Sequence, residues 1–337
     1  MIHGRTHDIP LAEARRLIER AIDKAEQLEL RGGIAVVGAS GALVSTSRMD
    51  RGGAGGMARA RSKAWISATQ QIPSAEHLKR MNFVSAPVER GFVACSPEAR
   101  FPGAGGMPVL DGSEVIGGIA ASGATVSPFF PRGIEPEKMI ADGQPANPED
   151  LLVHYALGLP YVGQHGDDYA RWTSQFGGWP ANPGAGVGGA EAPRSSKQFE
   201  HEWAVGLADD VIAEARGRRV RIAVAIVDHR GDPIQQDVMD DAPSAASFIS
   251  AATAATAATF QCLSSDLATT YGAGYGAGAG NASAVTQLQE SLPFAILAIA
   301  GGVPVEEDGR VVAGLGVAGA APALCAEIAL AALARRA

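Results

Sequence analysis

The sequence has few of the features that mark several large protein classes. It holds 3 cysteines in 337 residues, none in a C-x-x-C pair, so neither a disulfide framework nor a zinc site is predicted. It has no run of Lys and Arg, and its net charge is −8, which argues against partners such as nucleic acid or an anionic membrane surface. No uncharged stretch resembles a membrane-spanning helix, and the N-terminus lacks the apolar core of a signal peptide. A cytoplasmic protein is therefore expected.

Aromatic residues are also scarce, at 6% of the chain, whereas glycine is abundant, with 42 residues. Hydrophobic residues make up 46% and charged residues 19%, which is ordinary for a globular protein. The many glycines indicate tight turns and close packing of backbone segments. The length suggests two domains or one large one.

An internal repeat organises the chain. Residues 34–50 align without gaps with residues 224–240, and residues 105–124 align in the same way with residues 301–320. Each copy reads as an amphipathic helix, two strands joined by a tight glycine turn, a second helix and a strand hairpin. This order predicts an α+β fold in which each repeated unit is a central antiparallel sheet with flanking helices. The two units are expected to pack as a pseudo-dimer.

The second helix of the second copy, near residues 244–260, is almost pure alanine and threonine. Such a helix has little side-chain area of its own, so it is expected to lie close against a neighbouring sheet or helix.

Short motifs recur in the same order in both copies. In the first copy they are Arg48-Met-Asp50, Lys63-Ala-Trp-Ile-Ser-Ala68, Gly105-Gly-Met-Pro108 and Ser122-Gly-Ala124; in the second they include Val227-Asp-His-Arg-Gly231, Gly301-Gly-Val-Pro304 and Ala318-Gly-Ala320. Through these motifs the chain resembles the GlcG/HbpS family of heme-binding and small-ligand domains, which also supplies the C-terminal domain of PduO. The resemblance implies an α+β unit with a ligand pocket, assembly as a homo-oligomer, and heme as a candidate cofactor.

The two copies depart from each other at the motifs. Thr253 stands where the first copy has Lys63, and Val238 stands where it has Arg48. Conversely, Gly38 stands where the second copy keeps Asp228 before its turn. Relatives commonly carry a histidine after the turn glycine, which is absent from both copies. The working pocket is therefore expected in the first copy, with the second as its packing partner.

The segment between the copies breaks the pattern. We predict a first repeat over residues 1–158 with an insertion at about 125–146, a connecting segment over 159–199, and a second repeat over 200–337. Asn147 and Pro148 predict the start of a displaced closing helix that runs to residue 158. Eight of the 19 aromatic residues lie between residues 125 and 180. They predict either a lid over a site for a planar molecule or a simple anchor of the segment to the domain surface.

Candidate site residues follow from the resemblance and from the polar side chains in this segment. Lys63 has the chemistry to neutralise an anionic ligand or to act as a base, although a surface lysine is the alternative. His154 and His165 are further catalytic candidates, but their spacing matches no standard metal site, and no metal is predicted. The predicted ligand-binding residues are Arg48, Lys63, Gly105, Gly106, Ser122, Tyr155 and Trp172.

Three functions remain open from the sequence. The first is binding of a small planar or anionic catabolite in a pocket of the first repeat that the aromatic insertion covers. If the protein is an enzyme, it also transforms this catabolite. The alternative is a heme- or tetrapyrrole-binding module without turnover. A third, structural role is an assembly subunit. In each case we expect a homo-oligomer.

Overall fold

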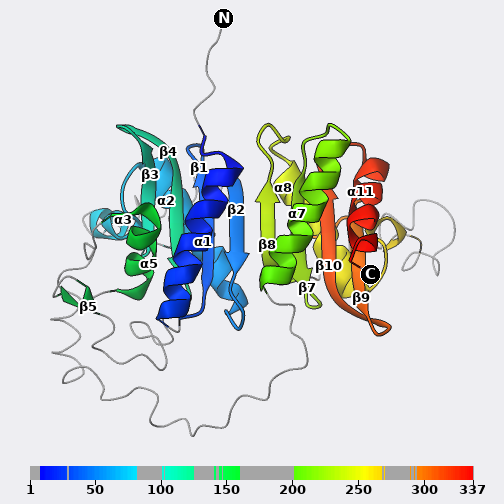
Figure 1. Cartoon of the computed structure of the whole chain (residues 1–337), viewed down its shortest axis with the longest axis horizontal. Helices are drawn as coiled ribbons and strands as arrows, with labels where there is room; N and C mark the ends of the chain where they lie inside the picture. The colour runs from blue at the N-terminus through cyan, green and yellow to red at the C-terminus, as the bar shows by residue number, and fades with distance from the viewer. Residues whose placement is uncertain are drawn as a thin grey trace, which may run out of the picture. The chain divides into compact units, whose positions relative to one another are not determined.

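The chain forms two compact units, unit 1 (residues 1–197) and unit 2 (residues 198–337), shown in Figure 1. A computed structural model describes residues 8–28, 30–81, 101, 103–124, 140–141, 144–145, 147–159, 201–267, 269, 289, 292 and 294–336. Both units have the same order of main elements, so the α+β fold and the repeat predicted from the sequence are confirmed. The pseudo-dimer packing stays a prediction.

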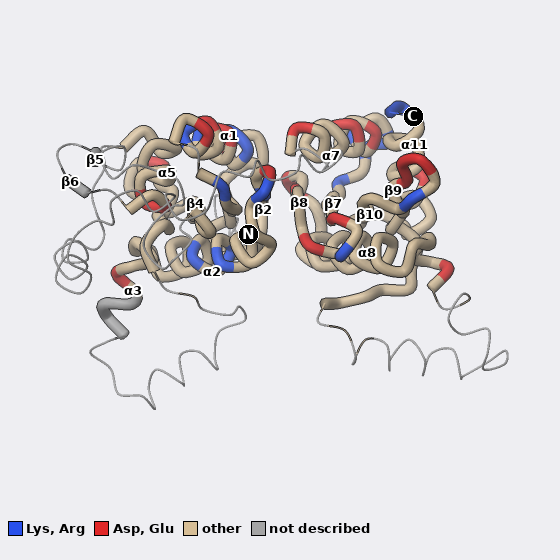
Figure 2. The backbone as a smooth tube through the Cα atoms, turned by 90° about the horizontal axis from the view of Figure 1, so that it is seen from below, with Lys and Arg blue, Asp and Glu red and all other residues tan. Residues whose placement is uncertain are grey.

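Unit 1 has a four-stranded sheet between two helical layers. The strand order is β3-β4-β1-β2, and all neighbours are antiparallel. Helices α1 and α5 cover one face and α2 covers the other (Figure 2). The elements are α1 (Leu11–Gln27), β1 (Gly33–Gly38), β2 (Leu43–Arg48), α2 (Ala54–Gln70), α3 (Ser74–Met81), β3 (Gly106–Asp111), β4 (Glu114–Ser122), the short pair β5 (Ile140–Ala141) and β6 (Gln144–Pro145), and α5 (Pro148–Leu157).

The two faces of this sheet are packed differently. Large side chains such as Leu17, Ile119 and Val153 fill the layer between the sheet and helices α1 and α5. On the other face, the alanines of α2 pack on Ala35 and Val37. Because these side chains are small, the backbone of α2 comes close to the backbone of the sheet.

Unit 2 repeats this arrangement. Its strand order is β8-β7-β10-β9, with antiparallel neighbours throughout. Helices α7 and α11 lie on one face and α8 on the other (Figure 2). The elements are α7 (His201–Gly217), β7 (Ala223–Asp228), β8 (Pro233–Val238), α8 (Ala246–Phe260), the 3-10 helix η2 (Ser264–Asp266), β9 (Gly302–Glu307), β10 (Arg310–Ala318) and α11 (Pro322–Ala334).

The alanine- and threonine-rich α8 lies directly on β10. A Cβ atom added to Gly314 would come within 2.9 Å of Ala258 N, and one added to Gly316 within 2.7 Å of Ala254 N. Two glycines of the strand therefore make room for the helix backbone. The close packing predicted for this helix is confirmed.

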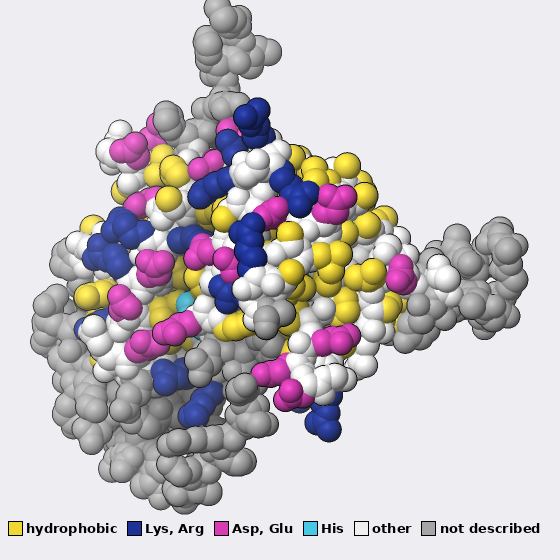
Figure 3. Space-filling model, turned by 45° about the vertical axis from the view of Figure 1, so that its right-hand side comes forward, with side chains coloured by type: hydrophobic (Ala, Val, Ile, Leu, Met, Phe, Trp, Pro, Cys, Tyr) yellow, Lys and Arg dark blue, Asp and Glu magenta, His cyan; other side chains and the backbone are white. Residues whose placement is uncertain are grey.

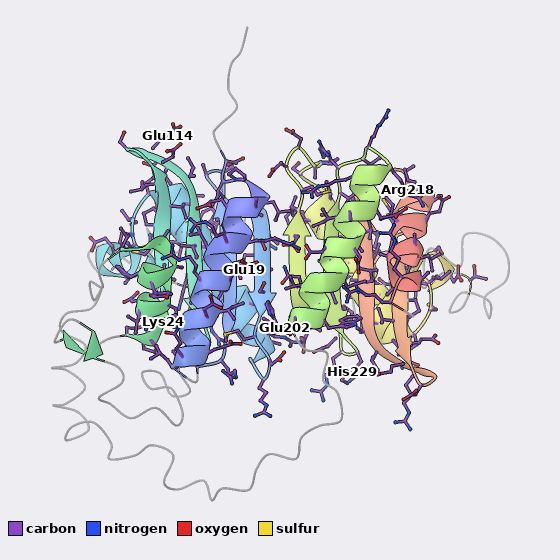
Figure 4. All side chains as sticks on the ribbon, viewed as in Figure 1. Glu19, Lys24, Glu114, Glu202, Arg218 and His229 are labelled. Carbon is purple, nitrogen blue, oxygen red and sulfur yellow. The ribbon has the colours of Figure 1, made fainter. Side chains whose placement is uncertain are left out.

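Ion pairs join α7 and α11 on the surface of unit 2. Arg218, labelled in Figure 4, donates to Glu214 at 2.9 Å and to Glu327 at 2.8 Å. These hydrogen bonds raise the pKa of the Arg218 guanidinium. On the face drawn in Figure 3, basic and acidic side chains are interspersed left of centre, and hydrophobic side chains gather to the right. None of the helices in the described ranges is both long and apolar enough to cross a membrane.

The turn between the first two strands of each unit is closed in the same way. Gly41 in unit 1 has φ +83° and Gly231 in unit 2 has φ +86°, as expected for a tight turn that needs glycine. In unit 2 the carboxylate of Asp228 accepts hydrogen bonds from the N–H groups of Arg230 at 2.9 Å and Asp232 at 3.1 Å. Asp228 therefore has a structural role in the turn.

In unit 1 a carboxylate from another segment takes over part of this role. Gly38 occupies the position of Asp228, and Asp8 Oδ1 accepts a hydrogen bond from the N–H of Ala39 at 2.8 Å. A Cβ atom on Gly38 would lie 2.6 Å from Asp8 Oδ1. The Asp8 carboxylate thus fills the space that an aspartate side chain at residue 38 would use.

We predict that Asp8→Ala lowers the free energy of unfolding by about 1 kcal/mol, because the turn loses a hydrogen bond to a charged acceptor. Adding Gly38→Asp to this variant is expected to restore the loss, since Gly38 does not have a positive φ. Urea unfolding of the wild type, both single variants and the double variant gives the coupling between the two positions. If the double variant is no more stable than Asp8→Ala, the Asp8 carboxylate does not take the place of an aspartate side chain at residue 38.

Candidate functional site

Lys63 is a charged side chain in the interior of unit 1. It lies on α2, the helix that packs closely on the sheet, and is only 3% exposed. An ammonium group buried this deeply is stable only beside an opposite charge and hydrogen-bond acceptors. The alternative of a surface lysine is therefore wrong.

Glu149, from the first turn of α5, is the charge partner of Lys63. Lys63 Nζ forms an ion pair with Glu149 Oε2 and donates a longer hydrogen bond to Ser122 Oγ at 3.4 Å. The second carboxylate oxygen, Glu149 Oε1, accepts the N–H of Gly123 at 2.8 Å. Both oxygens of the buried carboxylate thus have a donor, and the two charges balance. We call Lys63, Ser122, Gly123 and Glu149 the Lys63 cluster.

The local sequence explains how Glu149 reaches this position. The Asn147 side chain accepts the N–H of Glu149 at 3.0 Å and caps α5, and Pro148 occupies the first turn, as the sequence predicted. Gly105, with φ +104°, lets this turn approach the sheet, because a Cβ there would lie 2.6 Å from Glu149 Cβ. The N–H of Gly105 also donates to Asp150 Oδ1 at 2.6 Å. The residue just before β3 therefore holds the start of α5.

Gly106 makes room on the opposite side of the strand. A Cβ atom there would lie 2.7 Å from Ser74 Oγ and 3.0 Å from the carbonyl oxygen of Lys63. Close packing thus gives a physical reason for both Gly105 and Gly106. Their role as ligand contacts stays a prediction.

An aromatic side chain lies at the edge of the cluster. The Phe101 ring is 47% exposed, with Lys63 Nζ at 5.7 Å and Arg59 Cζ at 6.0 Å from its centroid. Arg59 lies one helical turn before Lys63, and its Nε donates to Ser122 Oγ at 3.4 Å. Two cations, a hydroxyl group and a half-exposed ring therefore come together at this end of the sheet.

Arg48 lies on the same face of the sheet, two strands from Ser122. Gly33 of β1 is the register partner of both residues. Register partners point their side chains to the same face, so Arg48 and Ser122 share the face that α2 covers. Two strand spacings place their Cα atoms about 10 Å apart. Contact between Arg48 and a ligand stays a prediction.

Two candidate residues on α5 contact α1 or their own helix. The Tyr155 ring lies beside two cations of α1, with Arg20 Cζ at 5.7 Å and Lys24 Nζ at 5.2 Å from its centroid; Lys24 is labelled in Figure 4. His154 is 3% exposed, and its Nδ1 lies 2.8 Å from the carbonyl oxygen of Asp150. The Tyr155 contacts help to anchor α5 on α1, whereas the His154 contact lies within α5. The proposed roles of Tyr155 and His154 in binding or catalysis stay predictions.

His165 and Trp172 lie outside the described residues, together with nearly all of the insertion at about 125–146 and of the segment 159–199. The predicted lid is therefore not tested. In the part of the chain that is described, no three His, Cys, Asp or Glu side chains gather as a metal site requires.

The matching position in unit 2 has different chemistry. Thr253 replaces Lys63, and its hydroxyl donates to the carbonyl oxygens of Ile249 at 3.0 Å and Ser250 at 3.1 Å within α8. Ala318 replaces Ser122, and the first turn of α11 (322–325) carries no carboxylate. The buried charge pair of unit 1 therefore has no equivalent at this place in unit 2.

Sequence reasoning missed Glu149, Arg59 and Phe101. A signal for Glu149 was present, because Asn147-Pro-Glu-Asp150 starts the displaced closing helix with two acids in its first turn. Arg59 lies four residues before Lys63, and this spacing places two side chains on one face of a helix. For Phe101 the sequence gave no signal.

Fold and site together define a protein of two tandem α+β domains, one of which holds a buried charge pair. The family model described as haem degrading protein HbpS-like matches residues 9–127 and 199–334, which is well over half of the chain. The chain therefore belongs to the HbpS-like family, and the resemblance inferred from the motifs is confirmed. Lys63 and Ser122 lie inside the first matched region, whereas Glu149 lies beyond its end.

Several solved structures are similar to parts of the chain. A double mutant of HbpS from Streptomyces reticuli is 27% identical and covers 42% of this chain and 89% of its own, with a TM-score of 0.36. The PduOC:heme complex is 23% identical, with coverages of 41% and 94% and a TM-score of 0.35. Protein ORFY of Klebsiella pneumoniae is 22% identical, with coverages of 42% and 93% and a TM-score of 0.36. No curated protein matches the chain.

Proposed function

We propose that unit 1 binds a small anionic molecule with a planar body at the Lys63 cluster. The observation that supports this is a buried ammonium group grouped with the Ser122 hydroxyl and the Gly123 N–H. These groups are fixed on a helix and a strand, which suits them to hold an anion in one orientation. The half-exposed ring of Phe101 offers a face for the planar part of the ligand.

Binding is the central part of this proposal. A lysine amine is also a group that enzymes use as a base or a nucleophile. If the ligand is transformed, Lys63 is the group proposed to take part. Product formation, followed in the samples used for the binding assay, tests this directly.

The proposal is tested by calorimetric titration of the full chain with a panel of aromatic and aliphatic anions and their neutral amides. The informative variant is Lys63→Met with Glu149→Gln, because it removes both buried charges together. We expect its affinity for an anion that binds the wild type to fall at least about tenfold, since a charge-assisted contact is lost. A matched control, Arg16→Met with Glu13→Gln, removes an exposed ion pair and is expected to leave affinity unchanged. Equal affinity in wild type and the Lys63/Glu149 variant would refute the proposal.

A heme- or tetrapyrrole-binding module is the second candidate, favoured by the family description. The propionate groups of heme are carboxylates, and Lys63 and Arg59 are cations suited to hold them. The Lys63 cluster contains no imidazole or thiolate for the iron, so an axial ligand would come from elsewhere, with His154 and His165 as the sequence candidates. Titration with hemin tests this candidate: a saturable Soret shift that weakens in His154→Ala or His165→Ala supports it, and no shift excludes it.

A further inference from the structure

The Lys63 cluster already contains a carboxylate in an ordered position. One oxygen of Glu149 meets the Lys63 ammonium and the other meets the Gly123 N–H. The donors belong to α2 and to the end of β4, whereas the carboxylate belongs to α5. Donor and acceptor therefore come from separate parts of unit 1.

The donors are held in place by contacts that do not involve α5. A Cβ atom on Gly118 of β4 would lie 2.8 Å from Ala68 N, and one on Gly56 of α2 would lie 2.9 Å from the carbonyl oxygen of Ser122. The backbones of α2 and β4 thus touch on both sides of the cluster. Because packed backbones move little, Lys63, Ser122 and Gly123 are expected to keep their arrangement when the carboxylate leaves.

We infer that the ligands of this site are carboxylates, and that Glu149 occupies the carboxylate position as an intramolecular competitor. The inference rests on the proposed function for the choice of site and names its ligand class. A bound carboxylate takes one hydrogen bond from Lys63 Nζ and one from the Gly123 N–H, as Glu149 does. Because a tethered group acts at an effective concentration of about millimolar or more, a small free carboxylate competes poorly in the wild type.

Removing the competitor is the direct test. Glu149→Ala deletes one methylene and the carboxylate, and acetate has the same heavy atoms as the deleted part. The melting temperature of this variant is measured in sodium acetate and in sodium chloride at equal ionic strength, because salt alone screens charges. We expect a saturable rise of about 3–6 °C in acetate and no such rise for the wild type.

Three controls separate a specific site from general anion effects. Acetamide has the shape of acetate without its charge and is expected to have no effect. Lys63→Met with Glu149→Ala lacks the cation and is expected not to respond to acetate. Glu214→Ala removes a carboxylate beside Arg218 and Arg335 on the surface of unit 2 and is expected not to respond either.

The outcomes are distinct. No acetate effect on Glu149→Ala, or an equal effect when Lys63 is also replaced, overturns the inference. If Glu149→Ala is recovered only unfolded in chloride, refolding in acetate becomes the readout: recovery supports the inference and no recovery overturns it. If Glu149→Ala responds to acetate while the wild type binds no anion of the panel, the proposed function fails and the carboxylate preference stands. If the wild type binds an anion and acetate has no effect, the inference alone fails.

Discussion

Replacement of Lys63 by methionine is expected to lower the free energy of unfolding of unit 1 by about 3–5 kcal/mol. Methionine keeps a long unbranched apolar side chain, so the main change is the loss of the ammonium group. The Glu149 carboxylate then remains buried without its cation, and a buried unpaired charge is among the most costly defects in a folded protein. Urea unfolding followed by circular dichroism measures the difference.

Two further variants check that the charge is the cause. Adding Glu149→Gln to Lys63→Met removes the orphaned carboxylate and is expected to recover most of the lost stability, because replacing both partners of a buried pair costs little. Arg16→Met breaks the ion pair between Arg16, whose side chain is 50% exposed, and Glu13, whose side chain is 38% exposed. This variant is expected to lower the free energy of unfolding by about 1 kcal/mol or less. If Lys63→Met lowers the free energy of unfolding no more than Arg16→Met does, the Lys63–Glu149 pair is not buried in solution.

The stability that the exposed Arg16–Glu13 pair contributes should also depend on pH. The hydrogen bond from Arg16 lowers the pKa of the Glu13 carboxyl. A lowered pKa in the folded state stabilises the protein above the unfolded pKa, and this stabilisation is lost as the pH falls through the folded pKa. The small difference between wild type and Arg16→Met is therefore expected at neutral pH and should vanish in acid.

Gly316→Ala is expected to lower the free energy of unfolding of unit 2 by about 2–4 kcal/mol. The new methyl group would lie 2.7 Å from Ala254 N and 2.8 Å from Thr253 Oγ1, and nearer still to the carbonyl oxygen of Ser250. Most of these atoms belong to the backbone of α8, so no change of rotamer relieves the clash. The helix must move away from β10 and loses contacts along its length. The measurement is again urea unfolding.

Gly217→Ala serves as the matched glycine control in the same unit. This residue ends α7, and beyond its chain neighbours and the backbone of its own helix no heavy atom lies within 4 Å of its added Cβ. Alanine favours the helix and restricts the unfolded chain, so a change between zero and about 1 kcal/mol of stabilisation is expected. Similar losses for Gly217→Ala and Gly316→Ala would mean that contact between α8 and β10 is not the cause.

The parts of the fold that were predicted correctly follow from local rules. The spacing of apolar residues in α1 is a short-range pattern, and Leu17, Ile18 and Ala21 are buried as it requires. The turn glycines Gly41 and Gly231 follow from the positive φ of a tight turn. The contact of α8 with the sheet was predictable because a helix of alanine and threonine has no other means of burying enough area.

The site was only partly predictable because its parts come from distant segments. The motif resemblance singled out Lys63 and Ser122, and in the structure Lys63 Nζ lies 3.4 Å from Ser122 Oγ. It did not locate Glu149, which is separated from Ser122 by an insertion and acts through a contact that depends on where α5 docks. It also assigned Gly105 and Gly106 to ligand binding; the structure gives both a packing role, and their binding role stays a prediction.

The dependence of the cluster on α5 affects how the chain can be divided for expression. The first family match ends at residue 127, but a recombinant fragment stopped there would lack the helix that neutralises Lys63 and shields the apolar side of α1. Such a fragment would be prone to aggregate for reasons unrelated to any ligand. Domain swaps and crystallisation trials on the N-terminal half should therefore extend through Leu159, whose N–H still bonds to α5.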